Sequence, residues 1–113
     1  MEKLKLRVFD FSPTPGFRHI EDGPFSGELF FREHLQPKFQ EAIDQNTILV
    51  VDLDGVKGYG TSFLEESFGG LARMYGAAKV NAHLEIISED EPYLADDIQT
   101  YIDEANLQAM VSG

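Results

Sequence analysis

The chain has 113 residues, 42% of them hydrophobic, and a formal net charge of −11, so we expect one domain with one core over residues 1–113. The absence of Cys excludes disulfides, zinc–thiolate sites and a thiol nucleophile, and the acidic balance argues against nucleic-acid binding. No stretch has the pattern of a membrane span or a secretion signal, which predicts a cytoplasmic protein that does not bind membranes.

The N-terminal segment is predicted to form a strand and a hairpin. Apolar and charged residues alternate over Lys3 to Phe11, which is typical of a strand with one buried face. Two prolines in Ser12 to Gly16 predict a loop, because proline cannot donate to a central ladder. Phe17 to Ile20 is then expected to form a second short strand that closes the hairpin.

A helical segment is predicted after the loop from Glu21 to Gly27. Ser26 has the character of an N-cap, and Glu28 places an acidic residue in the first turn. Pro37 predicts either a kink or a break between two helices. Four apolar residues then recur at four-residue steps: Phe31, Leu35, Phe39 and Ile43.

The central stretch is a strand followed by a helix. Thr47 to Leu53 is continuously apolar, which predicts a central, parallel strand buried on both faces. The next helix is expected to begin near Ser62 and to end at Gly76. Its core-facing residues have helical spacing: Leu64, Phe68, Leu71, Ala72 and Tyr75.

A final strand and helix complete the predicted fold. Ala78 to Ile87 alternates and predicts a strand, and Ser88 with Glu91 has the spacing of a capping box that would start the last helix. The expected core residues of that helix are Leu94, Ile98, Tyr101, Ile102 and Ala105. Strands that alternate with helices in this way predict an α/β sheet covered by helices.

Asp52 and Asp54 suggest one kind of chemistry. An apolar strand that ends in Asp-x-Asp-Gly-Val resembles the first motif of haloacid-dehalogenase-type phosphatases, in which magnesium lies between a carboxylate and the phosphate. Lys79 and the pair Asp96 and Asp97 could supply the remaining groups. The pair is predicted to lie within a helix rather than just beyond a strand, however, so a polar strand end is the preferred interpretation.

The glycine-rich turn before Thr61 suggests a second kind of site. Unpaired N–H groups at a helix N-terminus hold anions, so a small anion or a nucleotide could bind there, although the Gly-Lys-Ser/Thr ending of a phosphate loop is missing. The hydroxyl of Thr61 or Ser62 could also be phosphorylated, which would repel a docked partner. Alternatively, Ser62 and Glu65 form a capping box, and the hydroxyl has only a structural task.

Basic side chains and histidines give weaker signals. Arg18 and Arg32 flank the loop from Gly23 to Gly27 and could converge on an anion, although pairing with surface carboxylates is the more common role of such arginines. The three histidines show no metal-ligand spacing, so we predict no metal site.

The chain resembles the STAS (anti-anti-sigma factor) domains, and most closely a bacterial subgroup of STAS-like domains of unknown function. The resemblance rests on the strand, turn and helix of Thr47 to Leu71, on the loop Gly23 to Glu28 with Phe31 and Arg32, and on Leu84 to Asp90. It implies a mixed sheet of about four strands packed against three or four helices on one side. It also implies a regulatory protein whose partner is an anti-sigma-type kinase with a histidine-kinase-like ATPase fold.

In those factors the first Ser of an Asp-Ser-Ser-Gly motif is phosphorylated by the partner. The resemblance places that residue at Thr61 and the second at Ser62. This chain departs from the motif, since Gly60 replaces the Asp and Phe63 replaces the Gly.

These interpretations combine into one prediction: a non-enzymatic module without a cofactor that docks to a protein partner and is switched at Thr61 or Ser62. The predicted contact residues around the turn are Asp54, Gly55, Lys57, Gly58, Tyr59, Gly60, Phe63, Glu65 and Glu66. A second contact loop is expected to contribute Arg18, Gly23, Ser26, Gly27, Glu28 and Arg32. The alternatives are the magnesium-dependent phosphatase and the anion or nucleotide binder.

Overall fold

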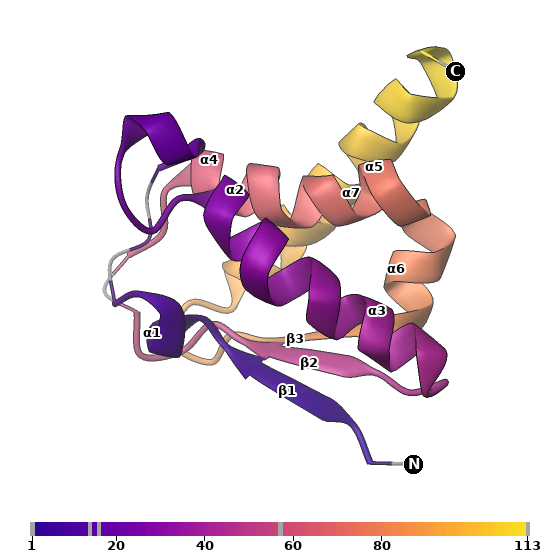
Figure 1. The fold of residues 1–113 in the computed structure, drawn as a ribbon, viewed down its shortest axis with the longest axis horizontal. Coiled ribbons are helices and arrows are strands. Elements are labelled where there is room, and N and C mark those ends of the chain that lie inside the picture. The colour runs from indigo at the N-terminus through magenta and orange to yellow at the C-terminus, as the bar shows by residue number, and fades with distance from the viewer. Residues whose placement is uncertain (1, 14, 16, 57, 113) are drawn as a thin grey trace.

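The structure, a computed structural model, describes residues 2–13, 15, 17–56 and 58–112. Its sheet has three parallel strands in the order β1-β2-β3 (Figure 1): β1 (Leu4–Arg7), β2 (Leu49–Asp52) and β3 (Leu84–Ile87). The α/β class and the central, parallel position of β2 agree with the sequence prediction. The expected mixed sheet of about four strands was wrong, because the described part of the chain forms three strands, all of them parallel.

The predicted hairpin does not form. Phe17 and Arg18 direct their carbonyl groups to the amides of Gly27 and Glu28, at 2.7 and 2.9 Å, so their backbone bonds lead to the start of a helix and not to β1. The first strand is also shorter than predicted. It gives way at Val8 to the single turn α1 (Val8–Phe11), which places the side chain of Val8 in the core.

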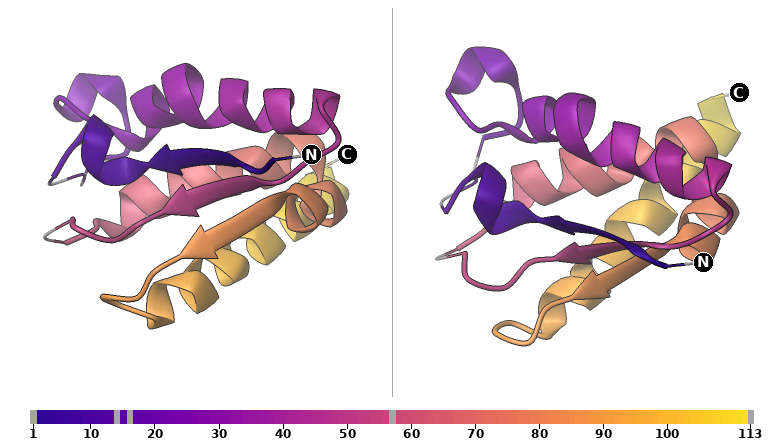
Figure 2. Two further views of the ribbon diagram at one scale, coloured as in Figure 1. Left: turned by 90° about the horizontal axis from the view of Figure 1, so that it is seen from below. Right: turned by 60° about the horizontal axis from the view of Figure 1, so that its bottom comes forward.

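All the helices that pack on the sheet lie on one of its faces (Figures 1 and 2). Right-handed crossovers that advance in the same direction put their helices on the same side, and the strand order β1-β2-β3 never reverses. The opposite face of the sheet is left without a covering layer (Figure 2, left).

The first crossover contains α2 (Gly27–Phe30), the π-helical turn η2 (Phe31–Leu35) and α3 (Gln36–Asp44), after the short 3₁₀ helix η1 (Ile20–Asp22). The helix therefore continues past Pro37. The wider π turn lies immediately before this proline, which has no backbone N–H to donate. Of the two alternatives left open by the sequence, the break between separate helices is wrong, because Leu35 and Gln36 keep helical dihedral angles.

The second crossover contains α4 (Thr61–Leu64), the π-helical turn η3 (Glu65–Gly69), α5 (Gly70–Tyr75) and α6 (Ala77–His83). Gly76 ends α5 with a φ of +88°, as predicted. The strand predicted over Ala78 to Ile87 was half wrong, because its first residues form α6 and β3 begins only at Leu84. Ala77 and Ala78 favour a helix, and the side chain of Val80 turns into the core.

The last helix, α7 (Tyr93–Ser112), begins later than expected. Ser88 does not form a capping box with Glu91; its hydroxyl donates to the carbonyl of Glu91 at 2.6 Å and closes a turn before the helix. Of the predicted core residues of α7, four are buried, namely Leu94, Ile98, Ile102 and Ala105, and Tyr101 is only partly buried against them.

The core lies between the covered face of the sheet and the helices. Leu49 and Val51 project from β2 into it and meet a layer of buried aromatic rings: Phe30, Phe39, Phe63 and Phe68. Over the described residues, no helix has the length and apolar character needed to cross a membrane.

Candidate functional site

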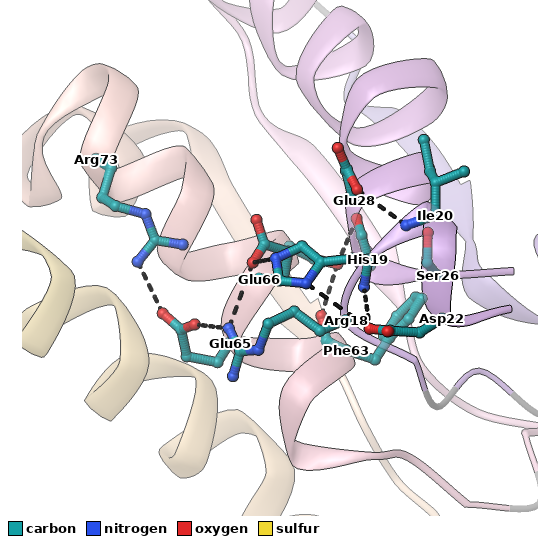
Figure 3. Close-up of polar contacts among 12 residues, drawn as sticks. Arg18, His19, Ile20, Asp22, Ser26, Glu28, Phe63, Glu65, Glu66 and Arg73 are labelled. Atoms are coloured by element: carbon teal, nitrogen blue, oxygen red, sulfur yellow. Dashed lines mark hydrogen bonds and ion pairs between the residues drawn. The ribbon is translucent and has the colours of Figure 1, made fainter.

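The two predicted contact segments meet in the structure. The amide of Gly60 donates to the carbonyl of Pro15 at 3.2 Å, which ties the turn before α4 to the loop that precedes α2. Farther along the loop, Arg18 extends over α4 and η3 (Figure 3). Segments 47 residues apart in the sequence thus form one surface at the start of α4.

Arg18 is the main link across this surface. Its guanidinium forms an ion pair and a hydrogen bond with Glu65 and lies 3.3 Å from Glu66. Arg73, from α5, donates to the other carboxylate oxygen of Glu65 at 2.8 Å (Figure 3). We call Arg18, Glu65, Glu66 and Arg73 the Arg18 network.

The contact between Arg18 and Glu65 shifts the pKa of both groups. The hydrogen bond to Glu65 raises the pKa of Arg18. Burial alone would raise the pKa of Glu65, but hydrogen bonds from Arg73 and Arg18 outweigh burial and lower it. Both groups are therefore held in their charged forms. Of the two roles that the sequence suggested for Arg18, pairing with carboxylates is the one observed.

The loop between Arg18 and Glu28 is braced by further polar contacts. His19 places one ring nitrogen 3.7 Å from Asp22 and the other 3.7 Å from Glu66. Glu28 accepts a hydrogen bond from the amide of Ile20 at 2.9 Å. Ser26 caps α2 as predicted, because its hydroxyl oxygen accepts from the amide of Leu29 at 3.1 Å.

Three predicted contact residues lie inside the protein. Ser26, Gly27 and Phe63 are fully buried, or nearly so, and none of them is on the surface that a partner would meet. Gly27 has a packing role, since a Cβ there would lie 2.7 Å from the carbonyl oxygen of Phe63. The missing side chain is what allows α2 and α4 to approach so closely.

The hydroxyls at the start of α4 are arranged differently from the prediction. The helix begins at Thr61, its N-cap is Gly60, and no side chain caps it. The predicted capping box of Ser62 and Glu65 was wrong, because Ser62 already lies inside the first turn and Glu65 is bound by arginines. Thr61 is exposed and Ser62 half-buried.

The acidic turn after β2 is held by its own carboxylates. Asp52 accepts from the amide of Asp54 at 2.9 Å, and Asp54 accepts from the amide of Asp90 at 2.9 Å. Asp90 accepts in return from the amide of Gly55 at 3.0 Å. These bonds join the turn after β2 to the turn after β3, which is the structural role that a polar strand end implies.

Tyr59 closes this turn. Its hydroxyl donates to the carbonyl of Leu53 at 2.7 Å. Burial, reinforced by the charges of Asp52 and Asp54, raises the pKa of Tyr59. The tyrosine therefore stays protonated and keeps its donor role at ordinary pH.

The groups named for the phosphatase interpretation are not gathered. Asp96 and Asp97 lie in α7, as the sequence indicated, and Lys79 lies in α6. Among the described residues, no three His, Asp or Glu side chains form a group that could hold a metal ion.

The remaining predicted residues divide into exposed and packed positions. Gly55, Gly58 and Arg32 are exposed. Gly23 packs closely against the ring of Phe17, since a Cβ added at Gly23 would lie 2.7 Å from a carbon of that ring. Lys57 lies outside the described residues. Sequence reasoning missed Arg73, whose only signal is a position two helical turns after Glu65.

These features define a small α/β domain with a parallel sheet, one helical layer and a strand-to-helix turn joined to a neighbouring loop. Residues 26–94 match the family described as a STAS-like domain of unknown function, and the chain belongs to this family, which confirms the resemblance seen in the sequence. No curated protein and no solved structure matches the chain.

Proposed function

We propose that the protein is a non-enzymatic regulatory module that docks to a protein partner through the surface at the start of α4. The observation that supports this most directly is the Arg18 network, which joins the loop before α2 to the helix after the turn. A surface assembled from two segments and fixed by charged contacts presents a defined shape to a partner.

The partner class follows from the family resemblance and from the acidic character of the chain after residue 45. Residues 46–113 contain twelve acidic and three basic side chains, so a complementary partner surface is basic. The STAS domains that this chain resembles bind regulatory proteins. Of these, we favour a histidine-kinase-like ATPase as the partner.

The proposed switch is the hydroxyl of Thr61, with Ser62 as the second candidate. Thr61 is exposed at the first residue of α4, and Glu65 lies one helical turn farther along the same face. A phosphate there adds roughly two negative charges, which compete with Glu65 for Arg18 and so break the contact that holds the two segments of the docking surface together.

The test compares Thr61→Asp and Ser62→Asp with the parent protein. Each immobilised variant is used to capture partners from a lysate of the source cells, and a captured ATPase is then purified for titration. We expect Thr61→Asp to weaken binding, while circular dichroism shows an unchanged fold. Gln108→Asp is the control, since it adds the same charge on the exposed side of α7.

Two results would overturn the proposal. One is equal binding by both switch variants and the control. The other is magnesium-dependent hydrolysis of phosphate esters that disappears in Asp52→Asn, because a binding module has no such turnover.

A further inference from the structure

The uncovered face of the sheet carries a set of side chains that the docking surface does not use. Register places Lys5, Val50 and Glu85 side by side, followed by Arg7, Asp52 and Ile87 in the last row. No helix lies over this face of the three strands (Figure 2, left). Parallel sheets are ordinarily covered on both faces, so a bare face of this kind needs an explanation.

One end of this face is closed by an ion pair. Lys3 reaches across β2 to Glu85 on β3, with 3.1 Å between Nζ and Oε1. Beyond the pair, toward the carboxyl ends of the strands, lies a hollow of about 330 Å³. Its lining consists of Lys5, Arg7, Asp10, Val50, Asp52 and Ile87.

The apolar part of the hollow is central and the cationic part is along β1. Val50 is 3% exposed and Ile87 is half-buried, so together they form an apolar floor. Lys5 and Arg7 are two residues apart on one face of the same strand, and both are exposed. Two like charges so close repel each other unless an anion lies between them.

Two carboxylates, Asp10 and Asp52, share the hollow with these cations. Asp10 forms an exposed ion pair with Arg7 at 3.9 Å. Asp52 is the register partner of Arg7, and its Oδ1 accepts from the amide of Asp54 at 2.9 Å. Among the described residues, Lys5 has neither an ion-pair partner nor a side-chain hydrogen bond.

We propose that this hollow binds a small organic anion, in which a carboxylate or phosphate group is attached to an aliphatic or aromatic body. The anionic group would lie between Lys5 and Arg7, and the body would cover Val50 and Ile87. A volume of about 330 Å³ is in the size range of small-molecule pockets. A sheet face of three four-residue strands is too small for a stable protein interface.

The test is a titration of the ¹⁵N-labelled full chain followed by NMR, with four eight-carbon probes. Octanoate and octyl phosphate carry the anion, octanol is neutral and octylammonium is cationic. We expect both anions to shift the amides of residues 5, 7, 50 and 87 in a saturable way. Octanol should bind at least about tenfold more weakly, because it lacks the charge-assisted contacts. Octylammonium should not compete.

The two anionic probes separate the two possible sources of the charge. Tighter binding of octanoate assigns the site to carboxylates, and tighter binding of octyl phosphate assigns it to phosphates. Shifts from an acidic peptide but from neither octyl anion would contradict the proposal and favour a protein ligand.

Variants locate the contacts. We expect Lys5→Gln and Arg7→Gln each to weaken octanoate binding several-fold and the double variant by about tenfold or more. Lys79→Gln is the matched control, since Lys79 is an exposed cation on α6, outside the hollow. Equal affinity in the double variant, equal binding of octanol and octanoate, or shifts confined to residues 17–25 would each overturn the proposal.

Discussion

The two faces of the sheet differ in what holds them. On the covered face, Leu49 and Val51 are completely buried beneath the helices. On the uncovered face, the two outer strands β1 and β3 carry Lys5, Arg7 and Glu85, which are exposed. The difference teaches that the fold takes its stability from one side of the sheet, which leaves the other side free to carry charges that a core would not tolerate.

The largest expected effect on stability comes from truncating a buried side chain on the covered face. Leu49→Ala removes a fully buried side chain and leaves a cavity, so we expect a loss of about 2–5 kcal/mol in the free energy of unfolding. Lys5→Ala, on the uncovered face, should change it by less than about 0.5 kcal/mol. Urea unfolding measures both. Equal losses would show that the two faces do not differ as described.

A smaller effect is expected where the helices of the covered face approach each other. Gly27→Ala places a Cβ 2.7 Å from the carbonyl oxygen of Phe63, which forces α2 away from α4. We expect a loss of about 1–3 kcal/mol. In Gly58→Ala the new methyl group meets no neighbour within 4 Å, so this variant should unfold like the parent in the same urea titration.

The Arg18 network lies at the outer edge of the helical layer, where solvent weakens ion pairs. Arg18→Gln should cost at most about 1 kcal/mol in global stability. It should nevertheless speed amide hydrogen exchange at residues 18–28, since those amides lose the link to η3. Arg32→Gln, an exposed arginine that the network does not include, should leave the exchange rates unchanged.

The smallest effect is the pH dependence of the same network. Because the folded state lowers the pKa of Glu65 below its ordinary 4.5, the stabilisation is present above pH 4.5 and is lost as the pH falls through the folded pKa. The protection factors of the amides at residues 18–28, which correct for the intrinsic pH dependence of exchange, should therefore fall in acid in the parent. In Glu65→Gln this acid-dependent fall should be smaller, and an unchanged fall would assign it to other carboxylates.

The parts of the fold that sequence predicts are those with one dominant pattern. Thr47 to Leu53 is apolar enough to be read as a buried central strand, and Gly76 marks a helix end that φ of +88° confirms. Ala78 to Ile87 misled because period-two alternation continues through residues that form α6. The alanines at its start favour a helix, and the alternation alone does not show where the helix gives way to β3.

The candidate site was predictable in its segments and not in its contacts. The loop of Gly23 to Glu28 and the turn before Thr61 were both identified from the sequence. Arg18 and Glu65 are 47 residues apart, and only the packing of α2 against α4 brings them together. The burial of Phe63 and Gly27 could not be predicted for the same reason. Each residue is covered by a neighbouring helix that is distant in the sequence.

The all-parallel strand order also sets the order in which this chain can fold. Leu4 pairs with Leu49, and Leu49 with Leu84, so no strand can find its neighbour by a local turn. Because closing the long crossovers costs entropy before the strands pair, we expect the helices to form first and the sheet to form late. In a stopped-flow experiment, helical signal should accordingly precede the burial of β2.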